Sequence, residues 1–141
     1  MSQSVTRQDL QNLSASKLND AELLFDNCRW ANAYYLAGYA IELALKACAA
    51  RQLQAETIPD KKLVNALYTH SFDQLVGLAG LRAELRNRQD QDSTFSANWG
   101  IVGEWTPDAR YEATDKSSAN FLIHAVGNAQ HGVLPWIRQY W

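Results

Sequence analysis

Two charged side chains, Glu42 and Lys46, interrupt the most apolar stretch of the chain. They stand four residues apart with the acid first, the order that favours an ion pair on one face of a helix. Tyr35 and Tyr39 share that face. Charges among apolar neighbours must be paired or face a cleft, so these residues form a structural network or line a ligand or dimer cleft. We expect Glu42 to be mostly buried and paired with Lys46, Arg110 or a tyrosine hydroxyl.

Arg110 and Tyr111 precede the last helical segment and form a second candidate for the same cleft. In an up-and-down bundle, that end of the last helix lies beside the turn between the first two helices. Arg110 can therefore meet Tyr35, Tyr39 or Glu42. Arginine is the side chain best suited to bind phosphate, so Arg110 either contacts a ligand or ties the loop down as a structural residue.

His124 lies in a polar stripe with Asn120 and Asn128, at intervals of four residues. If the chain cleaves RNA, His124 is the candidate acid–base residue, and either Lys116, eight residues earlier, or Arg110 is the candidate cation. General acid–base catalysis needs its partner within hydrogen-bond reach. The alternative for this stripe is a solvated or hydrogen-bonded helix face.

Three arginines form the densest basic cluster, at positions 82, 86 and 88. Arg82 and Arg86 share a helix face opposite Leu81 and Leu85. Such cations supply the affinity of proteins for phosphate backbones, so they are candidate RNA contacts. The alternative is an ordinary solvated face.

Metal, cofactor and nucleophile motifs are missing from the sequence. His124 and His131 are seven residues apart, about 10 Å along a helix, which is too far for both to bind one zinc ion. No HExxH, CxxC, G-x-S-x-G or phosphate-binding loop occurs. Cys28 and Cys48 stand in apolar contexts, most of a helix length apart, so we expect reduced core thiols. The sequence predicts neither a metal nor a cofactor.

The elements that position these residues are helical nearly everywhere. The 141 residues are 47% hydrophobic and 20% charged, with 7 Gly and 3 Pro, and they show no convincing strand alternation. We therefore expect one all-α domain over residues 1–141. A net charge of −2 disfavours a general grip on nucleic acid. The N-terminus lacks a signal-peptide pattern, and Glu42 and Lys46 make the apolar stretch a poor membrane span, so we expect a cytoplasmic protein.

Periodicity and capping residues predict the helix bounds. Thr6 and Asp9 form a weak capping box for a helix over Arg7–Asn27. The later elements are a helix over Ala31–Leu53, a connection over 54–69, a short helix from His70–Ser71 to Leu78 ended by Gly80, a helix from Leu81, a polar bend over 90–96, a turn over 106–108 and a last helix over Asp115–Tyr140. Gly132 and Pro135 should kink the last helix, whose seam includes Ala129.

The second helix carries a stripe of small residues: Ala33, Ala37, Ala40, Ala44 and Ala47. With its other apolar stripes, this helix is apolar over much of its circumference, so it is the central helix of the bundle or it also faces a second subunit. Trp105, Trp136 and Trp141 add aromatic area of the kind found in interface cores. From these features we predict a homodimer.

Four segments resemble HEPN-domain proteins. The string AYYLAGYAIELALKA, at 33–47, resembles the family's second helix, and Ala21–Leu24 resembles the end of its first. HSFDQLVGLAGL, at 70–81, resembles its short helix that opens with His. WTPDARY, at 105–111, resembles its Trp-then-Arg-Tyr element before the last helix.

This resemblance implies an up-and-down bundle of four main helices plus one short helix, usually homodimeric. Catalytic members of the family are metal-independent ribonucleases of toxin–antitoxin, antiviral or RNA-processing type, often paired with a nucleotidyltransferase-like antitoxin. Other members are non-catalytic and are thought to bind nucleotides or RNA. The catalytic motif of the family is an Arg followed after four to six residues by a His, and no Arg stands at that distance before any His of this chain.

The sequence therefore predicts a non-catalytic or catalytically degraded HEPN protein that binds a nucleotide, RNA or a protein partner. The alternatives are an active ribonuclease and a purely structural interaction module. A ribonuclease needs a His and an Arg or Lys that converge in one cleft. A binding protein needs a pocket at Tyr39, Glu42 and Arg110, whereas an interaction module would pack these side chains without a cavity.

Overall fold

The structure is a computed structural model that describes residues 4–141, and every regular element in that range is helical. The elements are α1 (Arg7–Asp26), α2 (Trp30–Ala50), α3 (Lys61–Ala66), α4 (Phe72–Leu78), α5 (Arg82–Gln91), α6 (Ser93–Gly103), the 3₁₀ helix η1 (Pro107–Tyr111), α7 (Lys116–Gly127) and α8 (Val133–Ile137). The all-α prediction is confirmed. No helix in the described range is long and apolar enough to cross a lipid bilayer.

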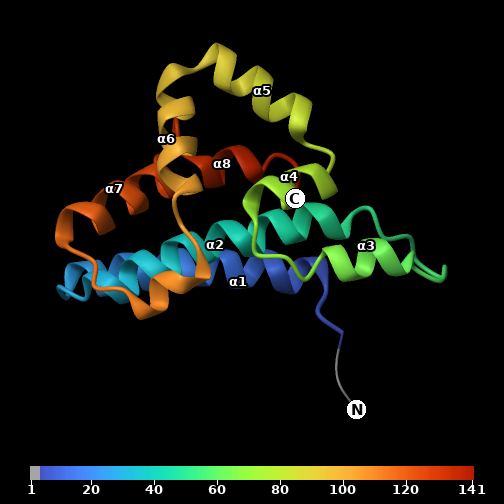
Figure 1. The fold of residues 1–141 in the computed structure, drawn as a ribbon, viewed down its shortest axis with the longest axis horizontal. Helices are drawn as coiled ribbons and strands as arrows, with labels where there is room; N and C mark the ends of the chain where they lie inside the picture. The colour runs from blue at the N-terminus through green and yellow to red at the C-terminus, as the bar shows by residue number, and fades with distance from the viewer. Residues whose placement is uncertain (1–3) are drawn as a thin grey trace.

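The long helices α1 and α2 lie side by side along the molecule, with α7 and α8 across one face and the α5–α6 pair arching above them (Figure 1). The predicted capping box starts α1, because the Thr6 hydroxyl accepts the Asp9 N–H and the Asp9 carboxylate accepts the Thr6 N–H. Ser71 caps α4 as expected, and Gly80 takes a φ of 74° just beyond it. The predicted bend falls at Asp92, between α5 and α6.

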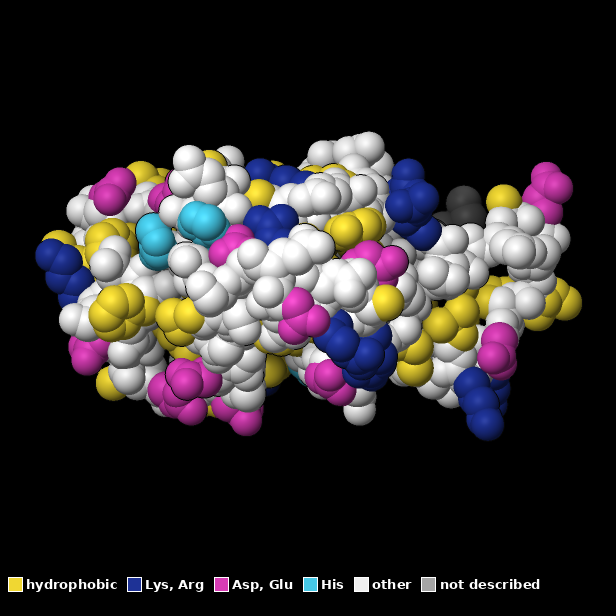
Figure 2. Space-filling view, turned by 90° about the horizontal axis from the view of Figure 1, so that it is seen from above, with side chains coloured by type: hydrophobic (Ala, Val, Ile, Leu, Met, Phe, Trp, Pro, Cys, Tyr) yellow, Lys and Arg dark blue, Asp and Glu magenta, His cyan; other side chains and the backbone are white. Residues whose placement is uncertain are grey.

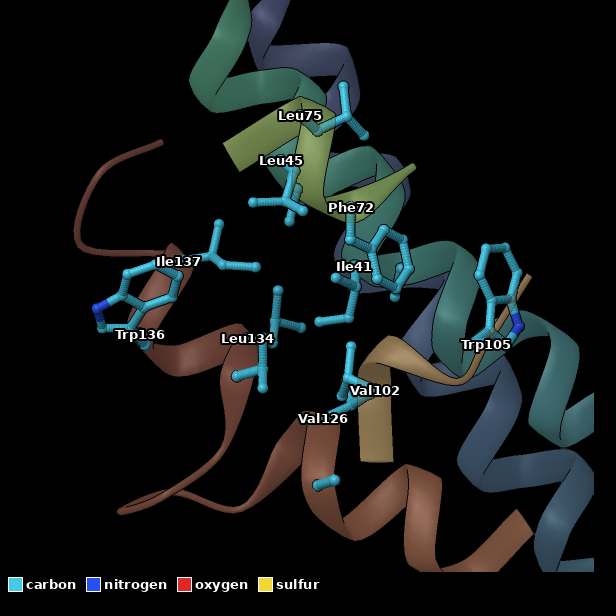
Figure 3. Close-up of a cluster of buried hydrophobic side chains, with 14 of the residues drawn as sticks. Ile41, Leu45, Phe72, Leu75, Val102, Trp105, Val126, Leu134, Trp136 and Ile137 are labelled. Atoms are coloured by element: carbon cyan, nitrogen blue, oxygen red, sulfur yellow. The ribbon is translucent and has the colours of Figure 1, made fainter. Parts of the chain in front are cut away.

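The core is built around α2, which contacts α1, α4, α7, α8 and η1. All five alanines of its small-residue stripe are fully buried within the single chain. Close approach at these alanines lets larger side chains of the surrounding helices fill the interior (Figure 3). These side chains include Phe72, Leu75, Val102, Trp105, Val126, Leu134, Trp136 and Ile137, which meet Ile41 and Leu45 of α2.

The predicted last helix over 115–140 is wrong in one respect, because it breaks rather than kinks. It ends at Gly127 and resumes as α8 only at Val133. The Asn128 side chain accepts the N–H groups of Gln130 and His131, so it offers these groups an alternative to the helix ladder. Ala129, expected in the bundle seam, is therefore exposed.

Three smaller expectations are corrected. The connection over 54–69 contains α3, which Asp60 caps by accepting the Lys62 N–H. The second helix spans Trp30–Ala50 rather than 31–53. Cys28 is exposed rather than buried, because it occupies the tight turn after α1 with a φ of 61°. Cys48 is buried as expected, and burial raises the pKa of its thiol to about 11.

Candidate functional site

Glu42 is a buried carboxylate with two basic partners. Its side chain is 2% exposed, and each of its oxygens meets a different basic group. Oε2 lies 3.5 Å from Nζ of Lys46, and Oε1 lies 2.8 Å from Nδ1 of His70. The predicted burial and the predicted pairing with Lys46 are confirmed. No described contact joins Glu42 to Arg110, the second partner that the sequence suggested.

His70 is the partner of Glu42 that sequence reasoning missed. The Glu42 carboxylate accepts a hydrogen bond from Nδ1 of His70, so the other ring nitrogen, Nε2, is directed away from the carboxylate. The His70 side chain is 57% exposed, so a buried acid orients a solvent-accessible imidazole. The sequence places His70 directly before the α4 cap Ser71, but only the packing of α4 on α2 brings it to Glu42.

A pocket of about 390 Å³ opens beside His70. Its walls include the aromatic side chains of Phe72, Trp99 and Trp105, and its polar lining includes Ser71 and Thr106. The volume lies in the range of small-ligand sites, and so does the mixture of aromatic walls with a few polar groups. The pocket can therefore take a planar organic ligand with a polar or charged end.

A row of aromatic rings extends from this pocket along α2. Phe72 and Trp105 stack with ring centres 5.4 Å apart and parallel planes (Figure 3). Tyr35 lies on Trp105 at 6.0 Å, and Tyr39 follows Tyr35 at 5.9 Å. Gly38 allows the approach of Trp105, because a Cβ there would overlap the indole ring. The buried Nε1 of Trp105 has no hydrogen-bond partner in the described part of the chain.

Arg110 lies at the tyrosine part of the row. Its guanidinium stands 4.9 Å from the centre of the Tyr111 ring, and both side chains are exposed. Hydrogen bonding with Tyr111, and then with Tyr35, raises the pKa of Arg110 above its usual range. Burial, and then the charge of Glu42, raises the pKa of Tyr39. These effects agree with the predicted meeting of Arg110 and Tyr35, and the aromatic row runs from Tyr35 to the pocket.

A second carboxylate–histidine pair lies at the α5–α6 junction. Asp92 Oδ2 is 2.7 Å from His131 Nδ1 and 3.5 Å from Arg88 Nε, while Oδ1 caps α6 by accepting the Phe95 N–H. The hydrogen bond from His131, followed by that from Phe95, holds the pKa of Asp92 below its usual range. Arg88 also donates to the Gln130 carbonyl at 2.8 Å. Figure 2 shows histidine side chains beside basic and acidic ones on one face.

The remaining candidates lie apart from these two clusters. Lys116 Nζ stands 5.6 Å from the centre of the Trp30 ring, and His124 is exposed on α7. No described hydrogen bond or ion pair joins those two residues. Arg82 pairs with Asp73 at 3.1 Å, and Arg86 is exposed, so both face outward as the sequence predicted.

Within residues 4–141, no group of three or more His, Cys, Asp or Glu side chains is placed to hold a metal ion. Comparisons with known protein families, curated proteins and solved structures find no match to this chain. The chemistry of the pocket itself must therefore carry the assignment of function.

Proposed function

We propose that this chain is a non-catalytic HEPN-type helical bundle that binds a nucleotide unit, either free or within RNA, in the pocket at His70. The observation that carries the proposal is the buried Glu42, which holds His70 at the edge of an aromatic pocket. A carboxylate at that depth is costly unless it is paired, and here its pairing orients a group that water and ligands can reach.

The lining suits a nucleotide in two respects. Trp99, the partly exposed ring of the lining, offers aromatic surface to a base, and base–aromatic stacking contributes about 1–3 kcal/mol per base. Phe72 and Trp105 are buried and stack on each other, so they form the apolar wall behind it. His70 and the hydroxyls of Ser71 and Thr106 offer hydrogen bonds to sugar or phosphate oxygens. Stacking tolerates any base, so we expect weak discrimination among the four nucleotides.

A titration followed by tryptophan fluorescence tests this function. Because Trp99 and Trp105 line the pocket, nucleoside monophosphates and a short single-stranded RNA should quench the emission of the protein. His70→Ala and Glu42→Gln should each weaken binding about tenfold, since the first removes a contact and the second removes the charge that strengthens the orienting hydrogen bond. His124→Ala, which changes an exposed histidine on α7, should bind as the unchanged protein does.

Failure of every nucleotide and of the RNA to bind at millimolar concentration would remove the proposal. Equal affinities of the unchanged protein and His70→Ala would place the binding elsewhere. The Phe72–Trp105 stack would then be a packing feature alone, which favours the structural interaction module.

A second candidate function is RNA cleavage at Arg88, Asp92 and His131. One observation favours it: a histidine and an arginine from distant segments meet on one carboxylate. This meets one part of what a metal-independent ribonuclease requires, a histidine and an arginine brought together, by residues outside the sequence motif of catalytic HEPN proteins.

The HEPN resemblance also extends to assembly. On that basis we propose a cytoplasmic homodimer that belongs to a toxin–antitoxin or defence system and has a nucleotidyltransferase-like antitoxin as partner. Co-purification of the chain with the product of a neighbouring gene would test the partnership, and a chain that always purifies alone would count against it.

A further inference from the structure

A smaller pocket, of about 200 Å³, lies between α5 and the C-terminal segment, on the side of the molecule where α5 arches over α8 (Figure 1). Its lining carries one carboxylate, one guanidinium and three side-chain amides. Glu84, Asn87, Arg88 and Gln91 of α5 face Trp136, Gln139 and Tyr140 across it. None of these residues belongs to the His70 pocket or to the aromatic row.

Glu84 is the unusual member of this lining. Its Oε2 atom is shielded from solvent and has no hydrogen-bond partner in the described part of the chain. Arg88 stands four residues after Glu84 on α5, a spacing and order at which a Glu and an Arg favour an ion pair. A shielded carboxylate oxygen without a donor is destabilising, so this unpaired state needs a reason.

Arg88 does not pair with Glu84, because its guanidinium is bound by other groups. Its Nε lies 3.5 Å from Asp92, its terminal nitrogen donates to the Gln130 carbonyl at 2.8 Å, and its guanidinium lies 5.1 Å from the centre of the Phe95 ring. Asp92 therefore balances the charge of Arg88. The carboxylate of Glu84 is left as the unbalanced charge of the pocket.

We propose that this pocket binds a small organic cation, with Glu84 as its counter-ion. An ammonium or guanidinium group would supply the donor that Oε2 lacks. The partly exposed ring of Tyr140 attracts cations to its face, and the amide oxygens of Asn87 and Gln139 can accept further N–H groups. The volume limits the ligand to an amine of a few carbons or to the end of a longer one.

Calorimetric titration of the full chain with putrescine and agmatine tests the proposal. Both should bind, whereas 1,4-butanediol, which has the length of putrescine without its charge, should not. Sodium chloride at matched ionic strength should not reproduce the effect. Glu84→Gln should weaken amine binding about tenfold or more, because a neutral amide replaces the counter-ion. Glu22→Gln, a matched change on the exposed face of α1, should leave binding unchanged.

A thermal melt without ligand gives an independent readout. Glu84→Gln should melt no lower than the unchanged protein, because it removes an unpaired carboxylate, and it should lose the rise in melting temperature that putrescine causes. Absence of binding by both amines, or equal binding by Glu84→Gln, would overturn the proposal. If that variant does not fold, Asn87→Leu fills the pocket from the exposed side of α5, and undiminished binding by it would overturn the proposal equally.

Discussion

The carboxylate of Glu42 pairs with two basic side chains at once. Lys46 is a neighbour on the same helix, whereas His70 comes from a segment 28 residues away. Because both oxygens are used, removal of the carboxylate leaves two donors without their acceptor. The same change also opens a space among the buried side chains of α2.

Glu42→Ala should lower the free energy of unfolding by about 3 kcal/mol, the lower end of the cost of breaking a buried pair, because His70 and Lys46 both keep some access to water. Urea denaturation measures this loss. Glu42→Gln retains the size of the side chain and one acceptor, so it should lose less. Unchanged or increased stability of Glu42→Ala would mean that the carboxylate is held at a stability cost, and would favour a binding role over a structural one.

Asp92 should make stability depend on pH in the acid range. Its pKa is lower in the folded chain than its ordinary value, chiefly through His131. Its contribution is therefore complete above the ordinary pKa and is lost as the pH falls through the folded-state pKa. Asp92→Asn keeps a residue that can cap α6, so it removes the charge alone.

Thermal melts at several pH values compare Asp92→Asn with the unchanged protein. The variant should melt several degrees lower at neutral pH, and this difference should shrink below about pH 4. His131→Ala should also melt lower than the unchanged protein at neutral pH, and this difference should likewise shrink at acid pH. A difference that stays constant down to about pH 3 would show that the charge of Asp92 is not what stabilises the junction.

For single residues, the sequence predicts side-chain pairs within one helix and misses pairs between segments that are distant in the chain. Glu42 and Lys46 share a face of α2, so their pairing follows from spacing alone. His70 reaches Glu42 only because α4 packs across α2, and no periodicity within either helix reports that crossing. Asp92 and His131, 39 residues apart, were missed for the same reason.

At the scale of elements, α2 depends on small residues where large neighbours approach. Trp105 stacks against Phe72 and against Tyr35, and Gly38 lies close beside its indole. A methyl group on Gly38 must displace a buried ring that has two aromatic neighbours. Interiors packed at this density do not absorb such a change freely.

Gly38→Ala should therefore destabilise the protein by about 1–3 kcal/mol, although alanine is the better helix former. Gly100→Ala is the matched control, since Gly100 lies within α6 with open space around the position of a new Cβ. It should stabilise by about 0.5–1 kcal/mol. Urea midpoints measure both changes, and near-ultraviolet circular dichroism reports on Trp105. If Gly38→Ala stabilised the protein as Gly100→Ala does, the Trp105 indole would be able to move away without cost, which would contradict the prediction.

The helix bounds could be predicted where a cap or a clear period exists. Thr6, Ser71 and Gly80 mark the ends of α1 and α4 correctly. The break after α7 could not be predicted from the period, since the apolar seam continues across it. There the Asn128 side chain competes with the helix ladder by accepting two backbone N–H groups, an outcome that depends on the surrounding loop.

At the scale of the whole molecule, the apolar character of α2 no longer requires a second subunit. The single chain buries the alanine stripe, Trp105 and Trp136. A homodimer must instead use side chains that the chain leaves exposed. The large ones include Leu23 on α1 and Phe121 on α7, which are 61% and 60% exposed, and α1 and α7 contact each other.

Light scattering at micromolar concentration should give about twice the chain mass of 15.9 kDa. Phe121→Glu should shift the protein toward the monomer, because a charge placed in an apolar interface is left without a partner. Ile58→Glu, at a similarly apolar and exposed position in the loop before α3, away from α1 and α7 in the chain, should not. A monomer in the unchanged protein would remove the homodimer proposal.

The arrangement of the whole chain keeps most of the candidate catalytic residues for RNA cleavage apart. The family's Arg–His spacing is absent, Lys116 lies against Trp30, and no described contact joins it to His124. Arg110 meets Tyr111 and Tyr35 rather than a histidine. A histidine and an arginine do meet at Asp92, but general acid–base catalysis also needs a substrate held against the imidazole, and His131 lines none of the described pockets.

Purified protein should therefore leave single-stranded RNA intact, with or without a chelator, over an incubation in which a known ribonuclease degrades it completely. Two variants assign any cleavage that does occur. Loss of cleavage in His124→Ala would make the chain a ribonuclease that uses α7, as the resemblance to catalytic HEPN proteins implies. Loss in His131→Ala, with His124→Ala still active, would place the reaction at Asp92 and Arg88, where Asp92 would hold the imidazole and the arginine would face the phosphate. Cleavage that survives both substitutions would point to a contaminant, and the nucleotide-binding function would stand without catalysis.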